Sequence, residues 1–527
     1  MTMKRSSGIL MPVSALPSPY GIGTLGKAAY DFADFLAAAG QKYWQLLPLG
    51  PTSHGDSPYQ SFSTYAGNPY FIDLDMLIAD GLLTQEEVDG CQWGSEPRYV
   101  DYGKIYESRF NVLALAKARG WKRDAAEVAL FMEENKRWLP NYALFMACKR
   151  HFGMKAWTEW EDEDLRLRKP EALELYREKL REDVEFYTYL QFLFFKQWNK
   201  LKAYIHSLDI KIIGDLPIYV ALDSADVWAE PEWFQLDSRN VPTEVSGVPP
   251  DYFSEDGQLW GNPLYRWDAM TADGYGWWIR RIDGAGKLFD VIRIDHFRGL
   301  ESYWSVPYGE KTAKNGKWVK GPGMHFVSAI SGWFPELEFI AEDLGYPTPE
   351  VAQLLRDSRW PGMKVLVFAF DSRESTAYLP HNYIENCICY TGTHDNTPLK
   401  EWHDEVAKKA DLQFAREYLG LNRKEGFNWG IVRGGMSSVA CLFVAQMQDY
   451  LEQGKGHRIN TPGTASGNWQ WRMLEGEASD KLAKKLLDLC VLYGRAEMPV
   501  VEKPETKRKT VKADKKAETV EKTDAAE

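Results

Sequence analysis

The segment Phe289-Asp290-Val291-Ile292-Arg293-Ile294-Asp295-His296-Phe297-Arg298-Gly299 has the pattern of a buried strand that ends in charged residues. Its apolar part is short and rich in β-branched side chains, which is typical of strands in a buried parallel sheet. Arg293 and Asp295 are two positions apart, so they point to the same side of a strand. We therefore expect an ionised carboxylate beside a guanidinium at the strand end, although a purely structural salt bridge would give the same pattern.

Six further apolar runs resemble this one, at residues 43–49, 210–220, 337–340, 363–370, 387–390 and 439–445. Helix-like stretches lie between many of them, at residues 25–39, 349–356 and 412–419, and the first is followed by the helix-ending Gly40. Alternation of strand and helix predicts an α/β fold with a parallel sheet. With about eight candidate strands, we expect a closed (β/α)8 TIM barrel with helical and loop insertions.

We expect residues 1–500 to form a single catalytic barrel with two insertions. The strand pattern stops at about residues 81–207, where one long helical stretch covers residues 171–207, so this part predicts a mostly helical insertion. Residues 223–266 are dense in Pro, Gly and Trp. Since loops longer than about 15 residues are uncommon unless they are functional, we interpret this segment as a lid or binding loop.

The end of the chain has a different composition. Residues 503–527 are dominated by Lys, Glu, Thr and Ala, contain no aromatic residue, and carry eight basic and six acidic side chains. Too little apolar surface is present to offset the entropy of ordering. We therefore expect residues 501–527 to be a disordered Lys/Glu-rich tail.

Composition excludes several classes of protein. Hydrophobic residues at 44% and charged residues at 26% are ordinary for a globular protein. The net charge of −12 argues against nucleic acid as a partner. No apolar run approaches the roughly 18 residues that a membrane span needs. The six cysteines form no CxxC pair, which fits a reducing compartment without a disulfide framework or a zinc site.

The first residues only faintly resemble a signal peptide. Lys4-Arg5 precedes an apolar stretch at residues 8–13, but Pro12, Pro17 and Pro19 interrupt this region and no small-residue cleavage site follows. We therefore expect a cytoplasmic protein.

Polar residues that follow the predicted strands are the candidates for chemistry, because the active site of a parallel barrel lies at the carboxyl ends of its strands. Glu342 and Asp343 follow one run, and adjacent residues of a strand face opposite ways. We favour Glu342 as the residue at the barrel mouth, where burial near another carboxylate would raise its pKa for general-acid work.

Two other strand ends carry similar groups. His394 and Asp395 could bind sugar hydroxyls or stabilise charge, while Asp215 could either face the site or cap a turn. A metal site formed by Asp295, His296, His394 and Asp395 is a competing interpretation. We disfavour it because no HxH or HExxH spacing is present, and we expect neither a metal nor a cofactor.

Carboxylates at several strand ends are the groups that glycosidic chemistry requires. The chain also has 21 Trp, 27 Tyr and 24 Phe, many of them beside Gly, Pro, Asn or Asp, where they could stack on sugars or simply fill a large core. No G-x-S-x-G elbow, P-loop or well-placed Rossmann fingerprint occurs, which weakens esterase, nucleotidase and dehydrogenase hypotheses.

Three motifs, Arg293-Ile294-Asp295-His296-Phe297-Arg298-Gly299, Ala341-Glu342-Asp343-Leu344-Gly345 and Thr391-Gly392-Thr393-His394-Asp395-Asn396, resemble the core motifs of the 4-α-glucanotransferases called amylomaltase or disproportionating enzyme. These enzymes form glycoside hydrolase family 77 of the α-amylase clan. Further matches lie at residues 57–63, 67–70, 247–254, 258–265, 460–464 and 468–472. The resemblance covers about residues 8–495, and its motifs occur in the family order.

The resemblance implies a barrel enzyme that transfers a segment of an α-1,4-glucan to the 4-hydroxyl of another glucan or of glucose. It implies Asp295 as nucleophile, Glu342 as general acid/base and Asp395 as stabiliser of the transition state. The substrate-binding residues that it implies are Tyr59, Asp215, Asp251, Trp260, Arg293, His296, His394, Asn396 and Asn468. The expected partners are maltodextrins, starch or glycogen, with no nucleic acid and no membrane, and we expect a monomer or a weak homodimer.

The sequence departs from the family pattern at one place. Thr397-Pro398 follows Asn396, where an Asp-Thr or similar pair is expected. The resemblance therefore does not predict the shape of the adjacent loop. Two alternative functions also stay open. One is an α-1,4-glucan hydrolase of the same clan, and the other is a non-catalytic glucan-binding protein.

Overall fold

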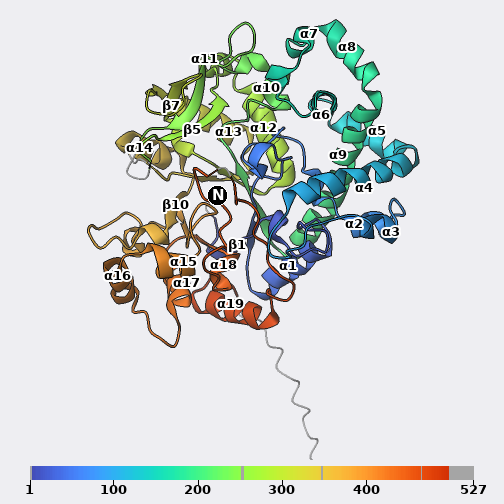
Figure 1. Cartoon of the computed structure of the whole chain (residues 1–527). Coiled ribbons are helices and arrows are strands. Elements are labelled where there is room, and N and C mark those ends of the chain that lie inside the picture. The colour runs from blue at the N-terminus through green and yellow to red at the C-terminus, as the bar shows by residue number, and fades with distance from the viewer. Residues whose placement is uncertain (1–2, 251–253, 346–347, 465, 498–527) are drawn as a thin grey trace, which may run out of the picture. The chain divides into compact units, whose positions relative to one another are not determined.

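A computed structural model describes residues 3–250, 254–345, 348–464 and 466–497. Among them, eight parallel strands close into a barrel in the order β1-β12-β11-β10-β9-β6-β3-β2 (Figure 1). The strands are β1 (Ser6–Leu10), β2 (Tyr43–Gln45), β3 (Lys211–Leu216), β6 (Val291–Ile294), β9 (Glu338–Ala341), β10 (Gly362–Val365), β11 (Cys387–Tyr390) and β12 (Leu442–Gln446). The predicted (β/α)8 barrel is therefore confirmed. The predicted tail at residues 501–527 and Asp251 lie outside the described residues.

Strand β1 closes the barrel, because it pairs with β2 on one side and with β12 on the other. The sequence pattern did not reveal it as a strand, since three of its five residues are Ser6-Ser7-Gly8 rather than part of an apolar run. Gly8 is required by packing: a Cβ atom there would lie 2.7 Å from Cβ and O of Tyr43 on β2. Each of the seven predicted runs overlaps one of the other strands.

Inward and outward side chains alternate along the barrel strands, as the period of two requires. Ile213, Val291 and Ile340 belong to the cluster inside the barrel, whereas Ile212 and Ile292 belong to the cluster shared with the helices. The helices around the barrel include α1 (Lys27–Ala38), α12 (Gly276–Leu288), α13 (Gly323–Trp333), α14 (Pro349–Ser358), α16 (Lys409–Leu419), α17 (Phe427–Ser437) and α19 (Asp480–Leu492).

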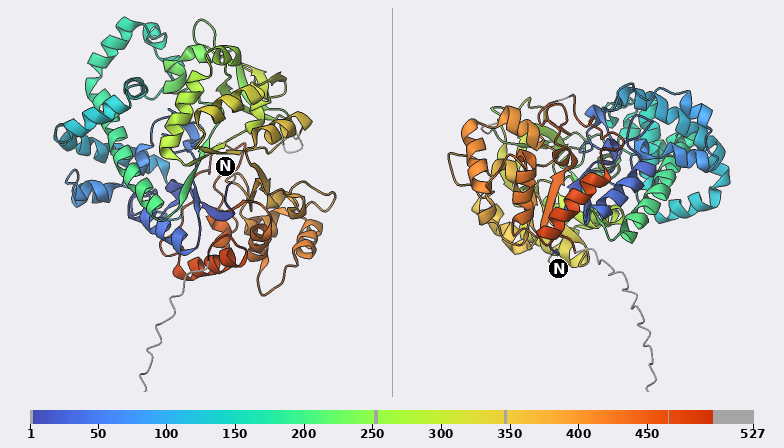
Figure 2. Two further views of the ribbon diagram at one scale, coloured as in Figure 1. Left: turned by 180° about the vertical axis from the view of Figure 1, so that it is seen from behind. Right: turned by 90° about the horizontal axis from the view of Figure 1, so that it is seen from below.

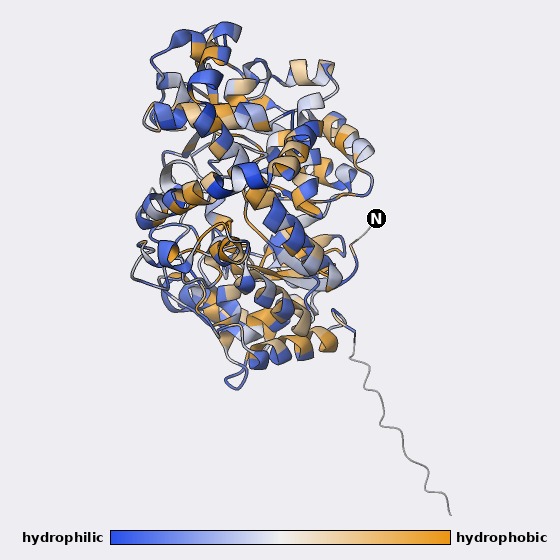
Figure 3. Ribbon diagram, turned by 90° about the vertical axis from the view of Figure 1, so that its right-hand side faces the viewer, coloured by the Kyte–Doolittle hydropathy of each residue, from blue (hydrophilic) through white to orange (hydrophobic). Residues whose placement is uncertain are grey.

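Hydrophilic residues (blue) and hydrophobic residues (orange) alternate along the helices drawn in Figure 3, as expected when only one face of a helix is buried. No helix within the described ranges is both long and apolar enough to span a bilayer.

Between β2 and β3 the described chain forms helices and no strand. The α-helices are α2 (Leu74–Ala79), α3 (Gln85–Asp89), α4 (Tyr102–Arg123), α5 (Ala125–Glu134), α6 (Leu139–His151), α7 (Glu163–Arg166), α8 (Pro170–Lys179) and α9 (Arg181–Ser207). They lie on one side of the barrel, coloured blue to teal (Figures 1 and 2). The helical stretch predicted at residues 171–207 consists of two helices, because the backbone of Leu180 (φ −110°, ψ 23°) leaves the helical region and separates α8 from α9.

The second insertion is more regular than its Pro- and Gly-rich sequence indicates. It contains α10 (Ala225–Ala229), β4 (Glu244–Val248) and β5 (Gln258–Pro263). Strands β4 and β5 join β7 (Ser302–Pro307) and β8 (Lys317–Lys320) in a four-stranded antiparallel sheet of order β5-β4-β7-β8. Glycine and proline within β4 and β5 interrupt the alternation that would have predicted them. This sheet carries Trp260 to the barrel mouth, against His296.

Candidate active site

Arg293 lies at the centre of the charged groups at the barrel mouth. Its Nη1 donates to Oδ1 and Oδ2 of Asp215, at 2.6 and 2.7 Å, and to Oδ1 of Asp295, at 2.9 Å. Arg293 and Asp215 are almost fully buried, whereas the Asp295 side chain is 29% exposed. Burial raises the pKa of Asp215, and the guanidinium opposes that rise. Arg293 therefore joins the ends of β3 and β6 and leaves Asp295 as the carboxylate that a substrate can reach.

The chain turns sharply directly after Asp295. The Asp295 amide donates to the Leu216 carbonyl at 3.0 Å, and His296 adopts a left-handed conformation with φ +54°. A non-glycine residue in this region is uncommon and costs about 1–2 kcal/mol. The turn aims the His296 amide at Glu342, and the His296 ring packs edge-on against Trp260 at 4.8 Å. Burial lowers the pKa of His296 to about 4, so this imidazole is neutral at physiological pH.

Glu342 directly follows β9. Its Oε2 accepts a hydrogen bond from the His296 amide at 2.7 Å, and its Oε1 accepts one from the Leu344 amide at 2.8 Å. Burial, and after it the charge of Asp295, raises the pKa of Glu342 to about 8. A carboxyl with this pKa holds its proton at neutral pH, as a general acid must. The adjacent Asp343 instead accepts a hydrogen bond from the Met363 amide on β10, so the two carboxyl groups have different surroundings.

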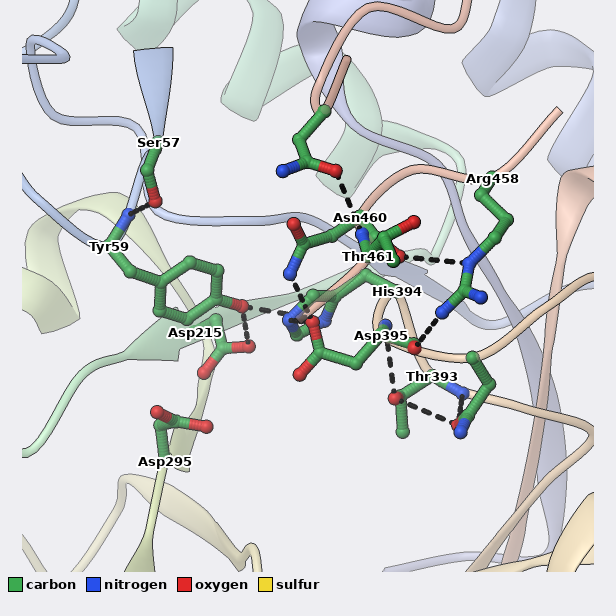
Figure 4. Close-up of polar contacts among 12 residues, drawn as sticks. Ser57, Tyr59, Asp215, Asp295, Thr393, His394, Asp395, Arg458, Asn460 and Thr461 are labelled. Carbon is green, nitrogen blue, oxygen red and sulfur yellow. Dashed lines mark hydrogen bonds and ion pairs between the residues drawn. The ribbon is translucent and has the colours of Figure 1, made fainter. Parts of the chain in front are cut away.

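The third carboxylate lies in the loop after β11. Asp395 Oδ1 accepts a hydrogen bond from Asn460 Nδ2 at 2.6 Å and lies 3.3 Å from His394 Nε2. The Asp395 side chain is 44% exposed. In Figure 4 its carboxylate points into the same space as those of Asp215 and Asp295. Three carboxylates from three different strand ends therefore meet at one mouth of the barrel.

Tyr59 connects two of these strand ends. Its hydroxyl donates to Asp215 Oδ2 at 2.8 Å, and its ring stacks on His394 at a centroid distance of 5.0 Å. The Trp469 ring lies 5.8 Å from the Tyr59 ring and 6.0 Å from the His394 ring. Burial, and after it the charge of Asp215, raises the pKa of Tyr59 well above its ordinary value, so the phenol remains a neutral donor.

Two of the residues expected to bind substrate form hydrogen bonds within their own loops. Asn396 Oδ1 accepts hydrogen bonds from the amide and hydroxyl of Thr393, and Asn468 Oδ1 accepts one from the Thr461 amide. Other residues at the barrel mouth contact one another directly. They are Tyr59, Asp215, Trp260, Arg293, Asp295, His296, Glu342, His394 and Asp395.

Three residues at the mouth had no assigned role in the sequence analysis. Asn460 and Trp469 lie within matched motifs, which could have identified them. Arg458 lies outside these motifs, and no sequence pattern marked it. Arg458 Nη2 donates to the Asp395 carbonyl at 2.7 Å, so it stabilises the main chain of the loop rather than a side chain. Only the folded structure brings this arginine to Asp395.

The competing metal site has no matching geometry. His296 packs on Trp260, whereas His394 pairs with Asp395 and Tyr59 at another strand end. Within the parts of the chain that the structure describes, no three His, Cys, Asp or Glu side chains converge so that they could hold a metal ion.

Fold and site together define a class: a (β/α)8-barrel enzyme whose carboxyl groups act on glycosidic bonds. The sequence model of the glycoside hydrolase family 77, described as 4-alpha-glucanotransferase, matches residues 11–477. The chain therefore belongs to this family, and its activity is that of a 4-α-glucanotransferase.

Individual relatives agree with this assignment along almost the whole chain. The 4-alpha-glucanotransferase of Clostridium butyricum is 49% identical over 92% of this chain and 100% of its own length. That of Thermus thermophilus is 47% identical over 92% of this chain and 98% of its own. Among solved structures, amylomaltase from Streptococcus agalactiae in complex with acarbose is 41% identical, with a TM-score of 0.91 over 94% of this chain and all of that chain.

Proposed function

We propose that this chain is a retaining enzyme that cleaves an α-1,4-glucan and transfers one segment to the 4-hydroxyl of an acceptor glucan or glucose. The observation that carries this proposal is the contrast between two neighbouring carboxyl groups. Asp295 contacts the Arg293 guanidinium, whereas burial and the nearby Asp295 raise the pKa of Glu342 to about 8. A nucleophile and a proton donor are the two groups that a retaining mechanism needs.

In the first step, an Asp295 oxygen attacks the anomeric carbon of the donor glucan. The bond between that carbon and the glycosidic oxygen breaks, and Glu342 gives its proton to the departing oxygen. The products are a glucosyl ester of Asp295 and a released glucan segment with a free 4-hydroxyl. Asp395 stabilises the positive charge that develops on the sugar, and Tyr59 and His394 flank that sugar.

In the second step, the ionised Glu342 takes the proton of an acceptor 4-hydroxyl. The acceptor oxygen attacks the anomeric carbon of the ester, a new α-1,4 bond forms, and Asp295 is released as a carboxylate. Glu342 ends the cycle protonated, so protons balance. Two inversions at one carbon retain the α configuration.

Transfer rather than hydrolysis requires the ester to meet a sugar hydroxyl before it meets water. Aromatic rings at the mouth support this outcome, because the half-buried Tyr59 and Trp260 can stack on sugars and so hold an acceptor in place of water. A glucan hydrolase would lack this bias towards an acceptor. A non-catalytic glucan-binding protein would have no need for a protonated Glu342 beside Asp295.

Incubation of the purified protein with maltotriose tests the proposal. We expect glucose together with a ladder of longer maltodextrins, which chromatography resolves. Accumulation of glucose and maltose without longer products would favour the hydrolase. The Asp295→Asn variant should lose the products while it still binds maltodextrins, and retained turnover in this variant would contradict the role of Asp295.

We further propose the setting in which this activity operates. The substrates would be maltodextrins, starch or glycogen, with glucose as acceptor and no cofactor, in the cytoplasm. Residues 1–500 would act as one catalytic domain, as a monomer or a weak homodimer. Sedimentation of the purified protein over a concentration series would test the oligomeric state, since a strong dimer would not dissociate on dilution.

A further inference from the structure

Asp449 is a buried carboxyl group that the proposed mechanism does not use. It lies in α18 (Met447–Tyr450), directly after strand β12, and is 1% exposed. Its Oδ2 accepts a hydrogen bond from Thr391 Oγ1 at 2.5 Å, and its Oδ1 accepts one from the Leu399 amide at 2.7 Å. Both carboxylate oxygens are therefore engaged by a part of the chain about 50 residues earlier.

The two donors mark the ends of the loop that carries Asp395. Thr391 is the first residue after β11, and Leu399 is the first residue of α15 (Leu399–Glu401). The segment between them, residues 392–398, contains both His394 and Asp395. One side chain thus fixes the two ends of this seven-residue loop relative to each other.

The segment that follows α18 reaches the same loop from its other side. The Asn460 amide donates to the His394 carbonyl at 3.1 Å, and Arg458 Nη2 donates to the Asp395 carbonyl. Asn428 on α17 donates through Nδ2 to the Asp449 carbonyl at 3.2 Å and so supports the turn itself. The Asp449 side chain and residues 458–460 therefore both hold the loop that carries the Asp395 carboxylate.

A purely structural role does not readily account for a carboxyl group at this position. Burial raises the pKa of Asp449 to about 7. The hydrogen bonds from Leu399 and Thr391 act in the opposite direction, but burial has the larger effect. Burying a charged group is costly, and apolar residues of similar volume often stabilise a core better. What the carboxylate adds is two directed hydrogen bonds that fix one geometry of the loop.

We propose that Asp449 is a positioning residue for the transfer reaction, which holds the loop of residues 392–398 so that Asp395 and His394 meet the reacting sugar. This inference rests on the proposed function. A shift of about 1 Å in a catalytic group can cost about 100-fold in rate. The aromatic residues that we propose bind the glucan, Tyr59 and Trp260, lie outside this loop, so loss of Asp449 should lower kcat much more than it changes KM.

The experiment compares Asp449→Ala with Asp449→Asn in maltotriose disproportionation. The amide of Asn can still accept from the Leu399 amide through its oxygen and donate to Thr391 Oγ1 through its nitrogen. We expect kcat to fall about 30- to 100-fold in Asp449→Ala and less than about fivefold in Asp449→Asn, with KM within about threefold of the parent in both. Thr391→Val removes one of the two donors and should give an intermediate loss of kcat.

Asp124→Ala provides the matched control. Asp124 is also buried and accepts hydrogen bonds from Arg123 and Tyr189, but it lies between α4 and α5, away from the barrel mouth. We expect this variant to lose thermal stability while kcat stays within about twofold of the parent. A comparable fall of kcat in Asp124→Ala and Asp449→Ala would overturn the positioning role, because general destabilisation would then explain both.

The outcomes separate this inference from the proposed function. If the parent protein makes no maltodextrin ladder, the proposed function fails, whatever Asp449 does. If the ladder forms and Asp449→Ala keeps the parent kcat, only the positioning role fails. If Asp449→Ala does not fold, Thr391→Val decides: a lower kcat at unchanged KM supports the inference, and the parent kcat overturns it.

Discussion

Asp295 and Asp395 lie on two sides of the barrel mouth that are built in different ways. On the first side, Arg293 and Asp215 extend from strands β6 and β3, and buried charges hold Asp295 in place. On the second side, Asp395 lies in a loop and accepts a hydrogen bond from Asn460, which comes from another loop. The exposed fraction differs accordingly, 29% for Asp295 and 44% for Asp395.

This difference indicates that the two sides of the barrel mouth have different roles in the reaction. The bond-making groups need fixed geometry and tuned pKa values, and rigid strands with buried charges provide both. Asp395, which we propose stabilises the transition state, lies instead in a loop that hydrogen bonds from other segments hold in place. Variants on the strand side should therefore have large effects on both rate and stability, whereas variants on the loop side should affect mainly the rate.

Glu342→Gln should have the largest effect on the strand side. The amide cannot donate and then recover a proton, so kcat should fall about 10³- to 10⁴-fold in maltotriose disproportionation. Asp343→Asn is the matched control, because Asp343 hydrogen-bonds to the Met363 amide and not to the turn after Asp295. A loss of rate in Asp343→Asn as large as that in Glu342→Gln would contradict the assignment of the acid.

Arg293→Ala should affect rate and stability together. It leaves the buried Asp215 without its guanidinium partner, which typically costs about 3–5 kcal/mol in the free energy of unfolding. The rate should fall about 100-fold or more, since Asp295 loses the same partner. Urea unfolding measures the first effect, and Arg373→Ala, which breaks an exposed ion pair with Asp371, should leave stability almost unchanged.

Alkaline pH should reveal the raised pKa of Glu342. The proton that this residue donates is present below a pKa of about 8 and is lost above it. The value of kcat/KM should therefore fall about fivefold between pH 8 and pH 9, and about tenfold per pH unit above that, because only the protonated enzyme can react. An activity that stays constant up to pH 10 would show that another group is the acid.

Asn460→Ala should have the smallest effect and should distinguish the loop side from the strand side. It removes one hydrogen bond to the Asp395 carboxylate, so kcat should fall about five- to tenfold. The melting temperature should change little, because the bond is only partly buried. A larger loss of stability than in Arg293→Ala would reverse the proposed contrast between the two sides.

The sequence predicted the strand side better than the loop side. Seven barrel strands were predictable because strands buried on both faces are continuous apolar runs, and Asp295 and Glu342 directly follow such runs. Strand β1 was not, since Ser6-Ser7-Gly8 lacks that pattern. The strands of the second insertion were hidden by glycine and proline within β4 and β5.

Contacts between loops could not be predicted from local sequence. Arg458 and Asn460 reach Asp395 from more than 60 residues away, and Arg458 does so through a main-chain carbonyl that has no sequence signature. The same reason applies to Asp449, whose position after β12 gave no indication of its link to Thr391 and Leu399. Asn396 and Asn468 form hydrogen bonds within their own loops, and their contact with a substrate stays a prediction.

The central claim is that Asp295 forms a covalent bond with the sugar while Glu342 supplies the proton. Mass spectrometry of the Glu342→Gln variant tests it most directly, with a glucosyl fluoride as donor, because fluoride departs without needing an acid. Without its general base the variant should accumulate the ester, so the peptide that contains Asp295 should gain the mass of one glucosyl unit. An adduct on a different residue, or turnover without any adduct in a rapidly quenched reaction, would contradict the account.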